Sequence, residues 1–112
     1  MNLIHIKRNG EFSVEPVIIS DERKKLFNDH LLLFFTGISR TASDICKKQI
    51  ETTKDKTAQL TRMMEMVPQA AKILSSESAD LTDFGKMLHE TWMLKRSLTD
   101  KISNSLVDEI YD

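Results

Sequence analysis

The chain has 112 residues, 40% hydrophobic and 29% charged, which is the composition of a folded domain. Its 16 Lys and Arg residues against 17 Asp and Glu residues leave a net charge of −1, so no overall field attracts nucleic acid or an anionic membrane. With one cysteine, no apolar run long enough to cross a bilayer and no signal peptide, we expect a cytoplasmic protein without nucleic-acid or membrane partners, and its length indicates one domain or part of one.

The first predicted element is a β-hairpin over residues 3–19. Asn9-Gly10 separates the apolar runs LIHIK and EFSVEPVII, and this dipeptide suits the two positive φ angles of a type I′ turn. Pro16 cannot donate a hydrogen bond to a neighbouring strand, so it marks a sheet edge or a bulge.

A short helix and a third strand are predicted next. Ser20 is placed to cap a helix over residues 21–28. The segment HLLLFF at 30–35 is apolar at the positions of both strand faces. We therefore predict an interior strand that is covered on both sides.

From residue 39 the hydrophobic period becomes helical. Thr41 and Asp44 have the spacing of a capping box at the start of a helix that runs to about residue 54. A second helix is predicted over 57–75, where Pro68 is expected to kink or split it. Its apolar residues are spaced alternately four and three positions apart, which forms an apolar seam along one side of the helix: Leu60, Met64, Val67, Ala71 and Leu74.

Two further helices complete the predicted fold. Asp80 is placed to cap a helix whose buried face carries Leu81, Phe84, Leu88, Thr91, Trp92 and Leu98, and a final helix begins near Ser105. The order β-β-α-β-α-α-α-α predicts an α+β fold, in which a bundle of three to four helices packs on a small sheet. Residues 1–38 form its β-rich segment and residues 39–112 its helical segment.

The sequence shows no familiar catalytic signature. Phosphate-loop, zincin and nucleophile-elbow motifs are absent, so no catalytic or metal-ligating residue is assigned. The three histidines lack metal-site spacing, and Cys46 on an apolar helical stripe is interpreted as a core residue. Two roles are possible for the methionines Met63, Met64 and Met66. Their position on the apolar seam favours packing in the core, and the alternative is a surface that binds a partner.

The polar turn at residues 36–40, Thr-Gly-Ile-Ser-Arg, is the strongest candidate site. Gly37 allows backbone amides to approach a ligand, the following helix start has free N–H groups, and Arg40 adds a planar donor that matches phosphate. The alternative is an ordinary connection from a strand to a helix with a surface arginine.

Three stretches carry a family resemblance: LLLFFTGISRTASDICKKQI, FGKMLHETWMLKRSLTDKISN and VDEIY. Together they resemble the GHMP sugar-kinase superfamily, and most closely its D-glycero-D-manno-heptose 7-phosphate kinases. In that branch a strand ends in a Thr-Gly-x-Ser-Arg turn, and a later helix carries a His-x-x-Trp-x-x-Lys pattern, here His89, Trp92 and Lys95. The resemblance covers essentially the whole chain.

The resemblance implies a sugar-phosphate site near Thr36, Gly37, Ser39 and Arg40. His89 and Lys95 would line the same cleft or hold the helices together. The parent activity is phosphorylation of a heptose 7-phosphate at its anomeric oxygen, with ATP and Mg²⁺ as cofactors.

Members of that family are much longer, and their nucleotide loop and catalytic aspartate lie outside the matched part. The resemblance therefore implies a fragment or truncated member of the kinase, with a partial GHMP kinase fold. We expect it to hold no cofactor and to be inactive alone, and to self-associate or pair with the missing kinase segments. The alternative is a stand-alone helical protein-interaction module derived from a kinase.

Overall fold

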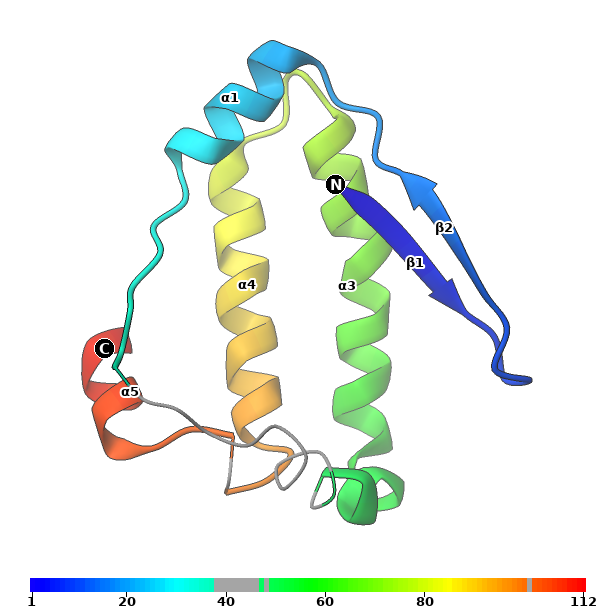
Figure 1. Ribbon diagram of the computed structural model, residues 1–112, viewed down its shortest axis with the longest axis vertical. Coiled ribbons are helices and arrows are strands. Elements are labelled where there is room, and N and C mark those ends of the chain that lie inside the picture. The colour runs from blue at the N-terminus through cyan, green and yellow to red at the C-terminus, as the bar shows by residue number, and fades with distance from the viewer. Residues whose placement is uncertain (38–46, 48, 101) are drawn as a thin grey trace.

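The computed structural model describes residues 1–37, 47, 49–100 and 102–112 (Figure 1). A two-stranded antiparallel hairpin and a set of helices form an α+β fold, which confirms the predicted class. The elements are β1 (Asn2–Ile6), β2 (Phe12–Pro16), α1 (Asp21–Asp29), the 3₁₀ helix η1 (Thr53–Lys56), α3 (Thr57–Ser75), α4 (Leu81–Arg96) and α5 (Ser105–Tyr111). Figure 1 shows α3 and α4 side by side, α1 across one end of this pair, and the hairpin next to α3.

The hairpin has the predicted strands but a different turn. Ile4 pairs with Val14 and Ile6 with Phe12. Gly10 has a φ of 87°, whereas no non-glycine residue among those described has a positive φ, so Asn9 does not complete a type I′ turn. The Gly10 N–H donates to the Lys7 carbonyl and the Lys7 N–H to the Glu11 carbonyl. This is the three-residue loop in which only the glycine adopts the left-handed conformation.

Helix α1 is fixed across the end of the α3–α4 pair. The Ser20 Oγ accepts a hydrogen bond from the Arg23 N–H at 3.0 Å, as the sequence predicted. The Arg23 side chain is only 4% exposed, and its Nη2 donates to the carbonyls of Ile73 at 2.9 Å and Ala79 at 2.7 Å. The Ile73 carbonyl, which also accepts the bond from the Ser76 N–H at 3.3 Å, lies in the last turn of α3, and Ala79 lies in the loop after it. The guanidinium therefore ties α1 to the C-terminal end of α3.

The helical pair matches its predicted bounds, but its buried face differs from the predicted seam. Helix α3 runs from 57 to 75 and continues through Pro68, so the proline does not split it. Met66 is buried at 3% exposure, whereas Met64 is 67% exposed and Val67 is also exposed. Both exposed residues line a hollow between α3 and β1. The stripe is therefore broader than the buried contact: Met66 is buried against α4, whereas Met64 and Val67 stay exposed between α4 and β1.

The rest of the small core lies at the two ends of α4. The buried apolar side chains among the described residues are Met66, Leu74, Leu81, Leu98 and Ile102. Asp80 caps α4 by accepting a hydrogen bond from the Thr82 N–H at 2.8 Å, which confirms the predicted helix start. The predicted contribution of Leu88 to this core is wrong, because its side chain is exposed. Helix α5 begins at Ser105 as predicted, although Asn104 and not Ser105 caps it.

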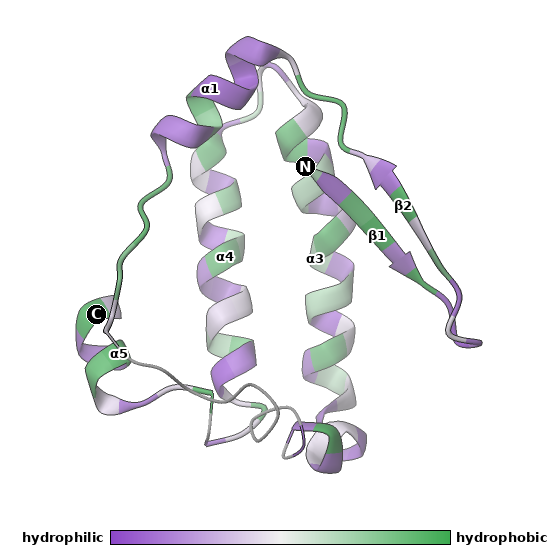
Figure 2. Ribbon diagram, in the orientation of Figure 1, coloured by the Kyte–Doolittle hydropathy of each residue, from purple (hydrophilic) through white to green (hydrophobic). Residues whose placement is uncertain are grey.

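The third strand does not form. His30 ends α1, and residues 31–37 belong to neither a strand nor a helix. Figure 2 shows this segment as an apolar stretch separate from the helices; Leu33 is 98% and Phe35 96% exposed. The physical reason is that a strand needs an edge to pair with, and the hairpin lies on the opposite side of the α3–α4 pair (Figure 1).

The predicted helix from 39 to 54 is described only in part. Thr41, Asp44 and Cys46 lie outside the described residues, and Lys47 and residues 49–52 are helical. The chain exposes 8840 Å² of surface, compared with about 6,300 Å² for a compact monomer of this mass. Much apolar surface is therefore left uncovered.

Candidate functional site

The first half of the polar turn has the conformation that its glycine predicts. Gly37 has a φ of 70°, and no atom lies within 4 Å of where a Cβ would be placed on it. The requirement for glycine is therefore conformational and not one of space. Thr36 beside it is half-buried. Ser39 and Arg40, the other two predicted ligands of the turn, lie outside the described residues.

His89 belongs to a cluster that joins α4 to α5. Its Nδ1 lies 2.8 Å from the hydroxyl of Tyr111, and the two atoms form a hydrogen bond. The two rings stack at a centroid distance of 5.8 Å and an angle of 13°, and the Trp92 ring lies 5.6 Å from that of Tyr111. His89 thus connects two helices, which is one of the two roles expected for it.

Arg96 is the member of this cluster that the sequence reasoning missed. Its guanidinium carbon lies 5.8 Å from the centre of the Trp92 ring, and its Nη2 lies 3.2 Å from Asp108 Oδ1 on α5. Lys95 is exposed and lies about 120° around the helix from His89, because six residues at about 100° each separate them. The sequence did contain a sign of this contact, because Trp92 and Arg96 are four residues apart and therefore lie on the same side of a helix.

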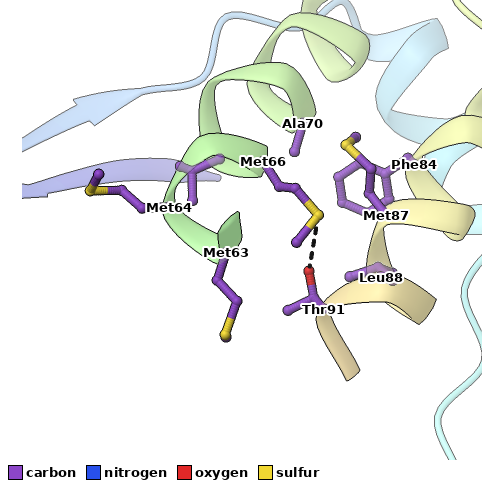
Figure 3. A pocket seen from close by; sticks show the side chains of 9 residues that line it. Met63, Met64, Met66, Ala70, Phe84, Met87, Leu88 and Thr91 are labelled. Atoms are coloured by element: carbon purple, nitrogen blue, oxygen red, sulfur yellow. Dashed lines mark hydrogen bonds between the residues drawn. The ribbon is translucent and has the colours of Figure 1, made fainter. Parts of the chain in front are cut away.

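A second feature is an apolar hollow between α3 and α4, which we call the methionine groove (Figure 3). It has a volume of about 320 Å³ and is lined by Met63, Met64, Met66, Val67, Ala70, Phe84, Met87, Leu88 and Thr91. The Thr91 hydroxyl donates to the Met66 sulfur at 3.8 Å. The methionines therefore serve both as core and as the wall of an open surface.

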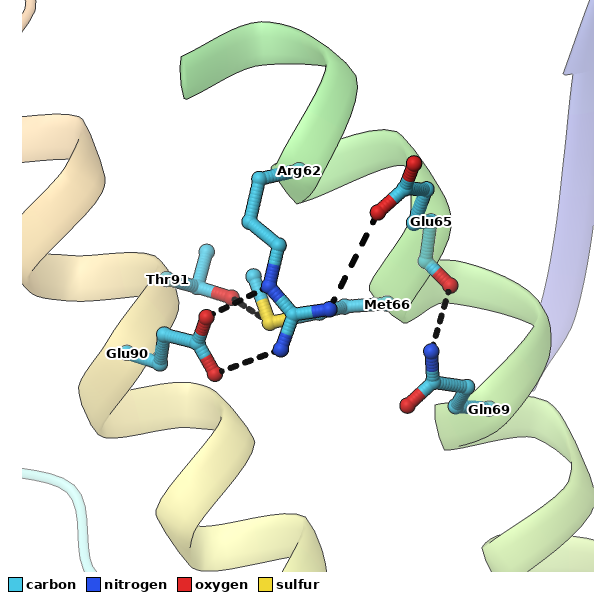
Figure 4. Close-up of polar contacts among 6 residues, drawn as sticks. All are labelled: Arg62, Glu65, Met66, Gln69, Glu90 and Thr91. Carbon is cyan, nitrogen blue, oxygen red and sulfur yellow. Dashed lines mark hydrogen bonds and ion pairs between the residues drawn. The ribbon is translucent and has the colours of Figure 1, made fainter. Parts of the chain in front are cut away.

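An ion pair crosses from α3 to α4 near this groove (Figure 4). Arg62 Nε donates to Glu90 Oε1 at 2.6 Å and Nη2 to Oε2 at 2.9 Å, a bidentate geometry. Glu65 lies further away, at 3.9 Å from Arg62 Nη1. The hydrogen bonds with Arg62 lower the pKa of Glu90, and those with Glu90 raise the pKa of Arg62. Both groups therefore stay charged, which suits a link between helices and not an acid–base catalyst.

Comparisons with known proteins add no family assignment. No family model matches the sequence, and no curated protein or solved structure matches it. Within the described ranges, no group of three His, Cys, Asp or Glu side chains is arranged to hold a metal ion. No helix in this part of the chain is long and apolar enough to cross a membrane.

Proposed function

We propose that the chain is a segment of a heptose 7-phosphate kinase of the GHMP type, without phosphotransfer activity of its own. The proposal is carried by one observation: an uncovered apolar segment, residues 31–35, leads directly into the polar turn at Gly37. In the family that the sequence resembles, a strand ends in this turn at the sugar-phosphate site. An interior strand of a larger sheet is covered on both faces, whereas the five side chains of this segment are exposed.

In this proposal the polar turn binds the phosphate of the sugar. The positive φ of Gly37 turns the chain so that backbone amides can approach an anion closely. Arg40 supplies a guanidinium that matches phosphate in shape and charge, while Thr36 and Ser39 supply hydroxyl groups. Lys95 contributes a mobile positive charge, and His89 holds α5 against α4 through Tyr111.

The proposal explains why no phosphotransfer is expected from this chain. Phosphoryl transfer depends on positioning the nucleotide phosphates and neutralising their charge with Mg²⁺ and cationic groups. The sequence has three glycines and no phosphate-loop motif. The parent enzyme would supply the nucleotide site from other segments.

A thermal-shift titration with a heptose 7-phosphate tests the proposal. A ligand that binds only the folded chain stabilises it by RT ln(1 + [L]/Kd), about 1.4 kcal/mol at ten times Kd. This corresponds to a rise in Tm of roughly 5 °C. Arg40→Ala is expected to abolish the shift. Arg8→Ala, which removes an exposed arginine near the hairpin turn, is the matched control and is expected to retain it.

Two results would contradict the proposal. The absence of any shift in a chain that melts cooperatively would remove the turn as a phosphate site, as would a shift that both arginine variants lose equally. Detectable ATP-dependent phosphorylation of the heptose by the purified chain would overturn the expected inactivity.

The methionine groove favours a second candidate, a protein-interaction module that binds an amphipathic helix. Flexible methionine side chains adapt to different apolar partners, and the groove between α3 and α4 is lined mostly by apolar side chains, as helix-binding grooves are. This candidate predicts no response to sugar phosphates. It also predicts saturable binding of an amphipathic helical peptide that Met87→Glu weakens and Lys95→Glu does not.

A further inference from the structure

The segment 31–35 has the properties of an unpaired β-strand. Its side chains are apolar at every position, and all five are exposed. Among the described residues, the backbone groups of 32–35 make no hydrogen bond. Such a segment pairs readily with a free sheet edge, because both its backbone groups and its side chains gain partners there.

The hairpin offers a free edge of matching length. Hydrogen bonds join Lys7 to Glu11 and Met1 to Val17, and antiparallel ladders alternate between bonded and non-bonded pairs. The N–H and C=O groups of Phe12 and Val14 therefore point away from β1. On the other side of the hairpin, β1 lies against the hollow next to α3. The end of β2 at Pro16 also borders α3, so the outer edge of β2 is open at Phe12 and Val14.

Within one copy, the segment cannot reach this edge. The two lie on opposite sides of the α3–α4 pair (Figure 1). Helix α1 connects them and is fixed across the end of the pair by the hydrogen bonds of Arg23. The edge-to-face contact of Phe27 and Phe84, at 5.1 Å between ring centres, holds it there as well.

We propose that residues 31–35 of one copy pair with the outer edge of β2 in a second copy, and that the exchange is reciprocal. The result is a twofold-symmetric dimer with two three-stranded sheets, each made from the hairpin of one copy and the segment of the other. Because the same two copies exchange strands with each other, the contact is isologous and the assembly closes at two subunits. The inference does not depend on the kinase proposal.

The area available is enough for a weak dimer. The two phenylalanines of the segment expose on the order of 300 Å², and the three leucines bring the apolar total to on the order of 500 Å². We expect each of the two sheets to cover about half of the apolar area of its segment and a similar area of the hairpin. The two sheets together then bury on the order of 1,000 Å². Interfaces of this size belong to weak, reversible complexes, so we expect a dissociation constant in the micromolar range.

Sedimentation equilibrium of the full chain, from about 1 to 500 μM, tests the proposal. We expect a reversible monomer–dimer equilibrium. Leu33→Glu and Phe12→Glu are each expected to raise the dissociation constant at least about 100-fold, because the substitution occurs in both sheets. Both positions are largely exposed in the single copy, so circular dichroism should show unchanged folding. Ile50→Glu, at a position that is 72% exposed and distant in sequence from the hairpin and the segment, is the control and should leave the dimer intact.

Mixing the two variants distinguishes reciprocal exchange from other dimers. In a mixed dimer, the Leu33→Glu copy supplies an intact hairpin and the Phe12→Glu copy an intact segment, so one of the two sheets is restored. We expect the mixture to associate more tightly than either variant alone.

The proposal would be overturned by a monomer at all concentrations or by open-ended assembly. A dimer that dissociates with Ile50→Glu but not with Leu33→Glu would place the interface elsewhere and overturn it too. None of these results affects the proposed sugar-phosphate binding, which is measured separately by the thermal-shift titration.

Discussion

Replacing Arg23 by methionine should release α1 from the end of the α3–α4 pair. Arg23 is the one charged residue among those described that is almost completely buried. Its Nη2 donates two hydrogen bonds, to the carbonyls of Ile73 and Ala79. Methionine keeps most of the apolar stem but removes both donors, so the change isolates the hydrogen bonds from the packing.

The expected loss of stability is about 3 kcal/mol. Each hydrogen bond from a charged donor contributes about 1.5–3 kcal/mol. Part of that is offset because removal of the guanidinium ends the cost of burying its charge. Its Nε is buried without a partner, which adds to that cost. For a chain of this size, 3 kcal/mol corresponds to a fall in Tm of roughly 10 °C.

Urea unfolding followed by circular dichroism measures this loss. Lys24→Met, at the exposed neighbouring position, is the control and should change the free energy of unfolding by less than about 0.5 kcal/mol. If Arg23→Met behaves like the control, the two carbonyl contacts do not hold α1 in place. Helix α1 would then not keep the hairpin and the segment 31–35 apart.

Three further predictions concern the helical pair. Met66→Ala should destabilise the chain by about 2–5 kcal/mol because it leaves a cavity, whereas Met64→Ala should change it little; equal effects in urea unfolding would refute the observed burial. Pro68→Ala should raise the free energy of unfolding by about 1 kcal/mol or more, because it restores a helical hydrogen bond; a lower Tm would contradict this. The pKa of Glu90 is lowered by Arg62, so this pair stabilises the fold above the ordinary glutamate pKa and loses its effect as the pH falls through the lowered value. The Tm difference between the wild type and Glu90→Gln should therefore shrink towards acid pH, and a difference that does not vary with pH would be inconsistent with the ion pair.

Local signals in the sequence predicted the secondary structure well wherever a helix begins. Ser20 and Asp80 cap their helices as expected, because an N-cap depends only on residues within one turn. The exact hairpin turn was missed because Asn9-Gly10 is compatible with two loop lengths. Only the pairing register, which places Lys7 opposite Glu11, decides between them.

Tertiary placement was predicted less well, for a physical reason. The periodicity of α3 identified a broad apolar stripe, but it could not show that Met66 is buried and Met64 is exposed. The segment 31–35 has the composition of a buried strand, yet burial depends on a neighbouring strand, and the hairpin lies on the opposite side of the α3–α4 pair (Figure 1). Arg23 was missed because a charged residue on a polar helix gives no sign of burial before the partner carbonyls of Ile73 and Ala79 are known.

The most direct test of the kinase proposal is the amide resonance of Gly37 in an NMR titration with a heptose 7-phosphate. The account predicts a saturable shift of this resonance that the unphosphorylated heptose does not cause and that Arg40→Ala removes. An unchanged Gly37 resonance, or a response confined to other cationic positions such as Arg62, would contradict the assignment of the turn as a sugar-phosphate site.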